Sequence, residues 1–244
     1  MSNIQKIALI TGSARRIGAE IAASLHQAGY GVVLHYRQSK PDAERLAARL
    51  NEQRDDSAWV MQADLQSVGE IQELVERLIA IHGRLDVLVN NASSFYPTPV
   101  AEVSEQQWDE LLGSNLKAPF FLSQSAFPAL AKNEGCIVNI VDIYAQRALP
   151  NYPVYSSAKA GLYALTETLA KELAPKVRVN AVSPGVIFWP ENHEVELADE
   201  VIEKIPLQRQ GKASDIAETV LFLVDQANYI TGQIIAVDGG KSLV

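Results

Sequence analysis

Short apolar runs alternate with longer segments of mixed polarity along the chain. The runs are rich in Val and Ile and apolar at almost every position, as in strands buried on both faces of a parallel sheet. The pattern predicts strands at 6–11, 31–36, 58–63, 86–91, 136–141, 177–182 and 233–238. Because helical segments separate most of these runs, we expect right-handed βαβ units, with helices on both faces of one sheet.

The intervening segments repeat apolar residues at the period of an α-helix. Helices are expected at 17–28, 43–51, 67–82, 153–172 and 213–225. Ser67 precedes Glu70 by three residues, as Ser104 precedes Gln107, which is the spacing of a capping box. No linker or internal repeat divides the sequence, so residues 1–244 are expected to form a single α/β domain.

One stretch differs from the rest of the chain. Residues 188–204 read FWPENHEVELADEVIEK, an acidic insertion after the sixth predicted strand. Ligands of open α/β sheets bind at the carboxyl ends of the strands. An excursion from that edge is expected to form a substrate lid at about 186–210, with Trp189 against the substrate. A solvated surface helix is the alternative; it accounts for the charges better than for Phe188 and Trp189.

Composition narrows the classes of function. With 48% hydrophobic residues the chain can form a sizeable core, and a formal net charge of -8 argues against general nucleic-acid binding. The single cysteine, Cys136, cannot form an internal disulfide, and its apolar surroundings predict a buried strand thiol. The sequence contains neither a cleavable signal pattern nor an apolar run of membrane-spanning length. We therefore expect a cytoplasmic protein with no membrane partner.

The segment TGSARRIGAE follows the first predicted strand. A strand, a glycine turn and a helix together present backbone N–H groups where a pyrophosphate binds. Gly12 would make the turn, and Gly18 would let the helix pack closely on the sheet. The match to G-x-G-x-x-G is poor, so this motif indicates a dinucleotide only in combination with others.

The end of the second strand indicates which dinucleotide is bound. An NAD site would place Asp or Glu there to bind the ribose hydroxyls. This chain has HYRQSK instead, with His35, Arg37, Ser39 and Lys40 and no acid. Together with Arg16, these groups would bind a 2′-phosphate, which predicts NADPH. A solvated basic strand end is the alternative.

Two further strand ends complete the expected cofactor site. Asp64 and Leu65 would lie beside the adenine, with Asp64 accepting from its amino group. The segment NNAS, 90–93, ends the fourth strand, and small Ala92 and Ser93 would let a cofactor pass closely. Asn90 and Asn91 can also be explained as turn residues.

Tyr155 and Lys159 share one face of a predicted helix because they are four residues apart. A lysine beside a phenol favours the phenolate, so we expect Lys159 to lower the pKa of Tyr155 from its usual value near 10. Such a tyrosine could donate a proton at neutral pH. Y-x-x-x-K alone is common by chance and identifies nothing.

The combination of motifs is far more specific. The order of the TG loop, NNAS, Asn115, Tyr155, Lys159 and SPG at 183–185 resembles the short-chain dehydrogenase/reductase family over nearly the whole chain. The resemblance implies a Rossmann fold with a seven-stranded parallel sheet of order 3-2-1-4-5-6-7, a nicotinamide dinucleotide and a homotetramer. It also implies that Lys159 holds the nicotinamide ribose and that Asn115 holds a proton-relay water.

Sequence and resemblance together assign a set of residues to the cofactor. These are Gly12, Arg16, Ile17, Gly18, His35, Tyr36, Arg37, Ser39, Asp64, Leu65, Asn91, Ala92, Ser93, Lys159, Pro184, Gly185 and Val186. No metal is assigned.

Two departures from the general family pattern indicate a particular subgroup of the family. Arg16 replaces the middle glycine of the loop, and Asp142 replaces the usual catalytic serine. Both resemble the pteridine reductases, and NNASSFYPTP, 90–99, resembles their pterin-binding loop. That resemblance implies that Phe95 stacks on a pterin and that Ser93 and Arg16 contact both pterin and cofactor. The expected substrate contacts are Arg16, Ser93, Phe95, Asp142, Tyr155 and Trp189.

The position of Asp142, thirteen residues before Tyr155, favours reduction of C=N over C=O bonds. A carboxylate would repel the oxyanion that develops during carbonyl reduction. Reduction of a ring imine forms no oxyanion, and Asp142 could accept from ring N–H groups and orient Tyr155 or a water as the acid. The alternative is that Asp142 merely caps a turn.

The residues and the resemblance together predict an NADPH-dependent pteridine reductase; the resemblance implies that it converts dihydropterin to tetrahydropterin, with oxidised pterins and folates as further candidates. Asp142, Tyr155, Lys159 and Asn115 are its expected catalytic residues. Two other functions stay open: a carbonyl or 3-oxoacyl thioester reductase, and a catalytically silent NADPH-binding sensor.

Overall fold

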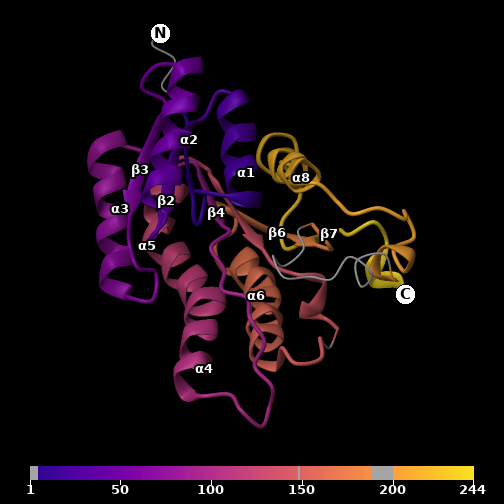
Figure 1. The fold of residues 1–244 in the computed structure, drawn as a ribbon. Coiled ribbons are helices and arrows are strands. Elements are labelled where there is room, and N and C mark those ends of the chain that lie inside the picture. The colour runs from indigo at the N-terminus through magenta and orange to yellow at the C-terminus, as the bar shows by residue number, and fades with distance from the viewer. Residues whose placement is uncertain (1–4, 148, 188–199) are drawn as a thin grey trace.

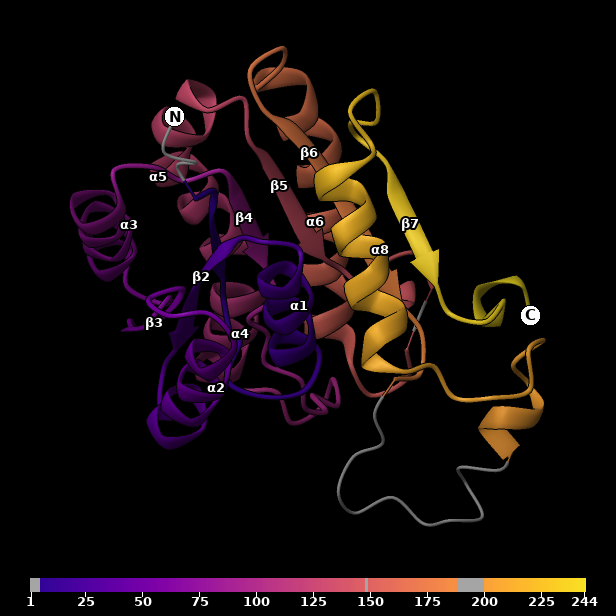
Figure 2. The same ribbon diagram turned by 90° about the horizontal axis from the view of Figure 1, so that it is seen from above.

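A seven-stranded, all-parallel sheet forms the centre of the molecule, as the computed structural model shows (Figures 1 and 2). The structure describes residues 5–147, 149–187 and 200–244. The strand order is β3-β2-β1-β4-β5-β6-β7, which confirms the expected Rossmann-like α/β fold. The strands are β1 (Ile7–Ile10), β2 (Gly31–Tyr36), β3 (Ala58–Gln62), β4 (Val87–Asn90), β5 (Cys136–Ile140), β6 (Arg178–Pro184) and β7 (Ile234–Val237).

Helices cover both faces of the sheet. The α-helices that concern the fold and the site are α1 (Arg16–Gln27), α2 (Lys40–Gln53), α3 (Val68–His82), α4 (Glu105–Leu112), α5 (Ala118–Lys132), α6 (Pro153–Glu172) and α8 (Ala213–Asp225). A π-helix, η1 (Gly113–Lys117), joins α4 to α5. Short 3₁₀-helices occur at η2 (Ile143–Ala145) and η3 (Lys241–Leu243).

The alternation of side chains along β1 explains the two layers. Ala8 and Ile10 belong to a core formed with α1, α2 and α8, whereas Ile7 and Leu9 belong to a second core formed with α3, α5 and α6. Successive strand residues point to opposite faces, so a strand covered on both faces must be apolar throughout. Cys136 lies in the first of these cores as a buried thiol, and burial raises its pKa to about 11. This confirms the prediction for the cysteine.

The start of α4 confirms one of the two expected capping boxes, while α3 has only half of the other. Ser104 and Gln107 exchange both bonds. Ser67 accepts from the Glu70 backbone N–H, but the Glu70 carboxylate accepts from the Asp64 N–H at 2.7 Å instead of closing the box. The expected exchange is therefore wrong for α3, because Glu70 instead holds the loop after β3.

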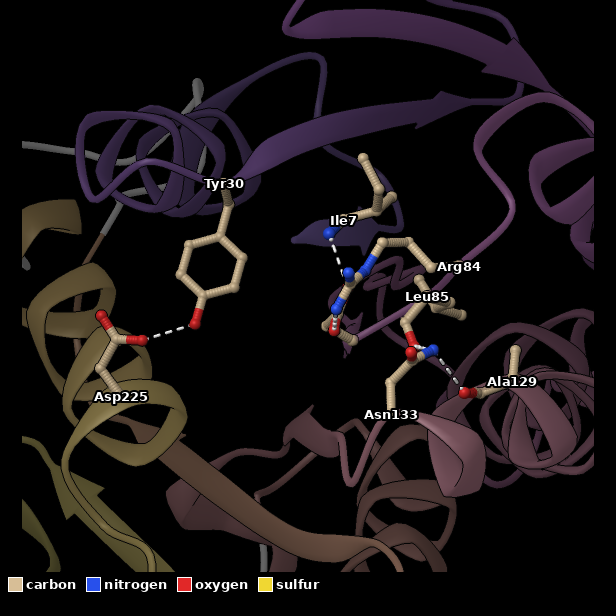
Figure 3. A network of polar contacts seen from close by, with 8 residues as sticks. Ile7, Tyr30, Arg84, Leu85, Ala129, Asn133 and Asp225 are labelled. Atoms are coloured by element: carbon tan, nitrogen blue, oxygen red, sulfur yellow. Dashed lines mark hydrogen bonds and ion pairs between the residues drawn. The ribbon is translucent and has the colours of Figure 1, made fainter. Parts of the chain in front are cut away.

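A polar network ties the amino ends of the strands together, away from the edge where ligands of such folds bind (Figure 3). Asp86 accepts from the Ile7 N–H at 2.8 Å and from two nitrogens of Arg84. The Tyr30 hydroxyl donates to Asp225 at the end of α8, at 2.5 Å. This end of the sheet thus has a structural role.

Two further expectations concern the substrate lid and the absence of a membrane-spanning segment. The proposed lid at about 186–210 includes residues 188–199, so Phe188 and Trp189 lie outside the described residues. Among the helices that are described, none has the length and apolarity needed to cross a membrane.

Candidate active site

The predicted site residues converge on the carboxyl ends of the strands. Gly12 follows β1, Tyr36 ends β2, Asn91 follows β4, Asp142 follows β5 and Pro184 ends β6. Because the strands are parallel, these positions share one edge of the sheet. Tyr155 and Lys159 face the same region from the first turns of α6.

Asp142 connects the two predicted roles of this position. Its Oδ2 accepts from the Tyr155 hydroxyl at 2.7 Å, and its Oδ1 accepts from the Tyr144 N–H at 2.9 Å. The second bond makes Asp142 the N-cap of η2. The turn-cap explanation and the catalytic one are therefore compatible, since each uses a different carboxylate oxygen.

Burial is the main cause of the pKa shifts of Asp142 and Tyr155. It raises the pKa of Asp142, against the opposing effects of the bonds from Tyr144 and Tyr155 and of the charge on Lys159. It also raises the pKa of Tyr155 well above its usual value, and the neighbouring Asp142 adds to the rise. At neutral pH, Tyr155 therefore keeps the proton that an acid catalyst must donate.

This direction corrects the expectation that Lys159 lowers the pKa of Tyr155. Lys159 is itself buried, which lowers its pKa to about 8, and its Nζ donates to the Ile140 carbonyl at 2.9 Å. The Nζ lies 5.8 Å from the centroid of the Tyr155 ring. Its attraction for a phenolate is outweighed by the burial of the phenol and by the closer carboxylate.

The glycine loop has the close packing expected of a dinucleotide cradle. Gly12 has a left-handed φ of +61°, and a Cβ on it would lie 2.9 Å from the Ala92 Cα. A Cβ on Gly18 would lie 2.5 Å from the Gly12 carbonyl oxygen and 2.5 Å from Asn91 Nδ2. Arg16, where the family pattern has glycine, also has a left-handed φ of 53°, and its side chain is exposed. The backbone thus keeps a glycine-like conformation at Arg16.

Asn91 supports this cradle from the neighbouring strand. Its Nδ2 donates to the Thr11 and Gly12 carbonyl oxygens at 2.8 and 3.0 Å. Thr11 Oγ1 accepts in turn from the N–H groups of Asn91 and Ala92. The Asn91 side chain therefore holds the loop after β1, as a turn residue would.

His35 also supports the loop, and it corrects part of the predicted phosphate site. Its Nδ1 accepts from the Gly12 N–H at 3.1 Å, so Nε2 carries the proton and donates to the Ala63 carbonyl at 3.1 Å. Only 2% of the residue is exposed, and burial lowers its pKa to about 4. His35 was expected among the groups that bind a 2′-phosphate; this buried ring stays neutral and adds no positive charge there, and its contact with the cofactor stays a prediction.

Exposed cations remain around the end of β2. Arg37 is exposed and lines an open cleft of about 620 Å³ together with Asp64 and residues of α4. Lys40 pairs with Glu44 at 3.6 Å, and Ser39 is the N-cap of α2. The sequence reasoning missed Arg15, whose guanidinium pairs with Asp42 on α2. The signal for Arg15 was its position in the glycine loop, beside Arg16.

The remaining cofactor candidates divide between the core and the strand ends. Leu65 is buried in the core with α3, and Ile17 packs against the core with α1. Tyr36 is half-buried at the end of β2. Gly185 passes so close to Asp238 that a Cβ would lie 2.6 Å from the Asp238 Cβ, and the Val186 carbonyl accepts from the Gly211 N–H.

The loop after β4 brings Phe95 to Tyr155, the predicted acid. The Phe95 ring lies edge-on to Tyr155 at 4.8 Å between centroids and stacks on Tyr152 at 4.6 Å, with 10° between the planes. Nevertheless 49% of Phe95 is exposed. Tyr152 was missed by the sequence reasoning; its spacing of three residues from Tyr155, one helical turn, could have indicated it.

Asn115 in η1 holds the loop that carries Phe95 through hydrogen bonds to Ser93 and Ser94. It is 1% exposed within η1, its Oδ1 accepts from the Ser93 hydroxyl at 2.7 Å, and its Nδ2 donates to the Ser94 carbonyl at 2.9 Å. Its Nδ2 also donates to the Leu111 carbonyl at 3.0 Å. The structure thus joins Asn115 directly to the loop that carries Phe95; the expected relay water stays a prediction.

Comparisons with known proteins agree with this geometry. A family model described as enoyl-(acyl carrier protein) reductase matches residues 12–242. Pteridine reductase 1 of Leishmania tarentolae is 40% identical over 278 aligned residues, covering 97% of this chain and 96% of that protein. A 3-oxoacyl-(acyl-carrier-protein) reductase of Staphylococcus epidermidis is 38% identical over 242 residues, covering 97% and 99%. Because the two identities are so similar, they do not distinguish a pteridine substrate from a 3-oxoacyl substrate. Individual side chains of the site must be used to distinguish them.

Proposed function

Because this chain belongs to the short-chain dehydrogenase/reductase family, we propose that it reduces C=N bonds of pterins with NADPH as the hydride donor. Membership of the family makes it an oxidoreductase of the nicotinamide-dependent class. The finer assignment rests on one observation: a partly buried carboxylate, that of Asp142, accepts a hydrogen bond from the Tyr155 hydroxyl at 2.7 Å. A carbonyl reductase would need a neutral donor at this place.

The cradle around the glycine loop fits a dinucleotide. Side chains are excluded at Gly12 and Gly18, so backbone N–H groups at the start of α1 can approach a pyrophosphate. Lys159 would hold the nicotinamide ribose, and Pro184 to Val186 would border the nicotinamide. When bound, the reduced nicotinamide supplies a hydride to the imine carbon.

The proton comes from this chain's own residues. Tyr155 donates its proton to the ring nitrogen next to the reduced carbon, and Lys159 offsets the phenolate charge that remains. Each carboxylate oxygen of Asp142 has a second lone pair, so Asp142 can accept from an N–H group of the substrate while it orients Tyr155. Ser93 and Arg16 are proposed as further contacts of the pterin.

The exposed ring of Phe95 supports an aromatic substrate. Tyr152 stacks on one face of that ring, and half of the residue remains accessible. A planar pterin placed on the accessible face would gain about 0.5–1.5 kcal/mol beyond its area of contact. Trp189, outside the described residues, and the lid at about 186–210 remain proposals.

Preference for NADPH over NADH is part of the proposal. The end of β2 reads HYRQSK with no acid to bind free ribose hydroxyls; exposed Arg37 follows β2, and exposed Arg15 pairs with Asp42 in the first turn of α2. Such cations would bind a 2′-phosphate by charge-assisted hydrogen bonds. Although His35 is neutral, two guanidinium groups remain for this role.

We also propose that the protein is a cytoplasmic homotetramer. β7 lies at one edge of the sheet with its residues only partly buried, and Phe222 on the adjacent α8 is 39% exposed. A second copy packed on this face would cover both. Sedimentation analysis would test the assembly.

NADPH oxidation with a panel of substrates tests the proposed function. The panel is dihydrobiopterin, biopterin, folate and an acetoacetyl thioester, with NADH in parallel. We expect turnover of the pterins, dihydrobiopterin first, and a preference for NADPH. Turnover of the thioester alone would favour the second candidate, a 3-oxoacyl reductase, which the Staphylococcus relative supports. Tight NADPH binding without any turnover would favour a silent sensor.

A further inference from the structure

One carboxylate of α4 bonds to both chain neighbours of Phe95, and the Tyr96 hydroxyl also donates to the Gln107 carbonyl of α4 at 3.4 Å. Ser94 Oγ donates to Glu110 Oε1 at 3.3 Å, and the Tyr96 hydroxyl donates to Glu110 Oε2 at 3.1 Å. The residues immediately before and after Phe95 are thus held by the two oxygens of one side chain. We infer that Glu110 is a positioning residue that sets the place of Phe95 and, through it, the binding of an aromatic substrate; this rests on the function proposed above.

The other contacts of the loop show why Glu110 matters to it. The Tyr96 ring packs against a small cluster formed by Leu111, Val154 and Tyr155. Burial is the main cause that raises the pKa of Tyr96, and the hydrogen bond to Glu110 is the second. Tyr96 therefore remains a protonated donor. Phe95 itself is 49% exposed, so burial does not fix its ring. Its position depends on Tyr152 and on the bonds of its neighbours.

Glu110 is held on a rigid support. The capping box of Ser104 and Gln107 fixes the start of α4, and the Glu110 carbonyl accepts from Ser114 Oγ at 2.9 Å where α4 passes into η1. The residue also lines the cleft that contains Arg37 and Asp64. Its carboxylate therefore stands between the proposed adenosine side of the cofactor site and the substrate loop.

Loss of the carboxylate should weaken substrate binding more than it slows the chemical step. Glu110 touches none of the proposed reacting groups, whereas Phe95 would contact the ring in both ground and transition states. An interaction of that kind changes KM with little change in kcat. With NADPH saturating, Glu110→Ala is expected to raise KM for dihydrobiopterin roughly 3- to 10-fold and to leave kcat within about twofold.

Two variants distinguish positioning from a general effect of charge. Glu110→Gln keeps one acceptor oxygen at the same reach and should recover part of the lost affinity. Asp109→Ala removes the same charge one residue away; the Asp109 side chain is exposed and makes no hydrogen bond or ion pair to the described residues. Asp109 lines the same cleft as Glu110, and saturating NADPH keeps any effect on the cofactor out of the measured KM. Asp109→Ala should leave KM unchanged. An equal rise in KM in Asp109→Ala, or a fall in kcat at constant KM in Glu110→Ala, would overturn the inference.

Hydrogen exchange tests the loop without depending on the substrate. The amides of residues 93–96 and of Thr98 should exchange faster in Glu110→Ala than in the parent or in Asp109→Ala, and unchanged exchange would overturn the inference. If the parent reduces the thioester and no pterin, the proposed function fails, while the exchange result still decides the role of Glu110. If Glu110→Ala does not fold, Tyr96→Phe and Ser94→Ala each remove one donor and should each show part of the faster exchange.

Discussion

At the scale of single residues, Asp142 carries the choice between imine and carbonyl chemistry. In Asp142→Ser the hydroxyl could still contact the substrate, but the oriented acceptor for Tyr155 and for a substrate N–H group would be lost. Loss of a positioned acid–base partner typically costs 10²–10⁴-fold, so kcat/KM for dihydrobiopterin should fall at least about 100-fold.

Asp142→Asn is the matched control for this change. The amide oxygen can still accept from the Tyr144 N–H, so the cap of η2 and the fold should survive. Pterin turnover should nevertheless fall, since the amide has lost the carboxylate charge. Full pterin turnover by Asp142→Ser would remove the special role given to the aspartate.

His35 makes a prediction about acid stability. Its pKa is lowered to about 4 in the folded protein, against 6.5 for an ordinary histidine. Between these values the unfolded chain binds a proton that the folded chain does not, so the free energy of unfolding falls as the pH falls from about 6.5 to 4. The full effect is roughly 3 kcal/mol.

Urea unfolding at a series of pH values measures this effect. His26 and His82 also have pKa values lowered by burial, and they change stability in the same direction. Comparison with His35→Asn isolates the single ring, because the asparagine oxygen can still accept from the Gly12 N–H. The variant should lose less stability between pH 6.5 and 4; parallel curves would contradict the assignment.

The residue scale also shows what the sequence could and could not reveal. The spacing of Asp142, Tyr155 and Lys159 was sufficient to predict that their side chains lie close together, because one helix and one strand end fix their geometry. It could not give the direction of the Tyr155 pKa shift, which depends on burial by distant segments. For the same reason His35 looked like a surface cation in the sequence, although the folded chain covers it.

At the scale of elements, two helical glycines have opposite expected effects. A Cβ at Gly18 in α1 would meet backbone atoms of Gly12 and Ser13 at 2.5 and 2.9 Å, so the helix or the loop must shift. Overpacking of this kind costs about 1–3 kcal/mol. Gly18→Ala should therefore lower the unfolding free energy and weaken NADPH binding, as measured by calorimetry.

Gly69 in α3 provides the control. A Cβ there would meet its nearest atom, Ser67 Oγ, at 3.8 Å, which is an ordinary contact. Since alanine favours a helix over glycine, Gly69→Ala should raise the unfolding free energy by about 0.5–1 kcal/mol. Two destabilising results would mean that glycine replacement itself, and not the cradle, is responsible.

Elements differed in how well the sequence predicted them. The inner strands were predictable because burial on both faces makes them nearly continuous apolar runs, and the edge strands β3 and β7 are mostly apolar although they are only partly buried. The π-helix η1 was not, since its wider turn arises where α4 passes into α5 and Asn115 bonds back to the Leu111 carbonyl. The role of Asn115 toward Ser93 and Ser94 follows from that turn and has no periodic signature.

At the scale of the whole molecule, opposite ends of the sheet have different tasks. The carboxyl ends carry the candidate catalytic and cofactor residues, and the amino ends carry the network of Figure 3. Tyr30 in that network joins the start of β2 to the end of α8, and these segments are 195 residues apart in sequence. Changes there should affect stability and leave catalysis intact.

Tyr30→Phe tests this division of tasks. Tyr30 is 4% exposed, so phenylalanine keeps its packing and removes only the bond to Asp225. A hydrogen bond to a charged group contributes about 1.5–3 kcal/mol, and the exposure of Asp225 favours the lower end of that range. Denaturant unfolding should show this loss, while kcat and KM stay those of the parent. Tyr229→Phe, at a fully exposed tyrosine, should change neither stability nor rate. The bond between Tyr30 and Asp225 does not touch the candidate active site at the carboxyl ends of the strands. A slower enzyme in Tyr30→Phe would therefore contradict the division of tasks and show that the two ends of the sheet are coupled.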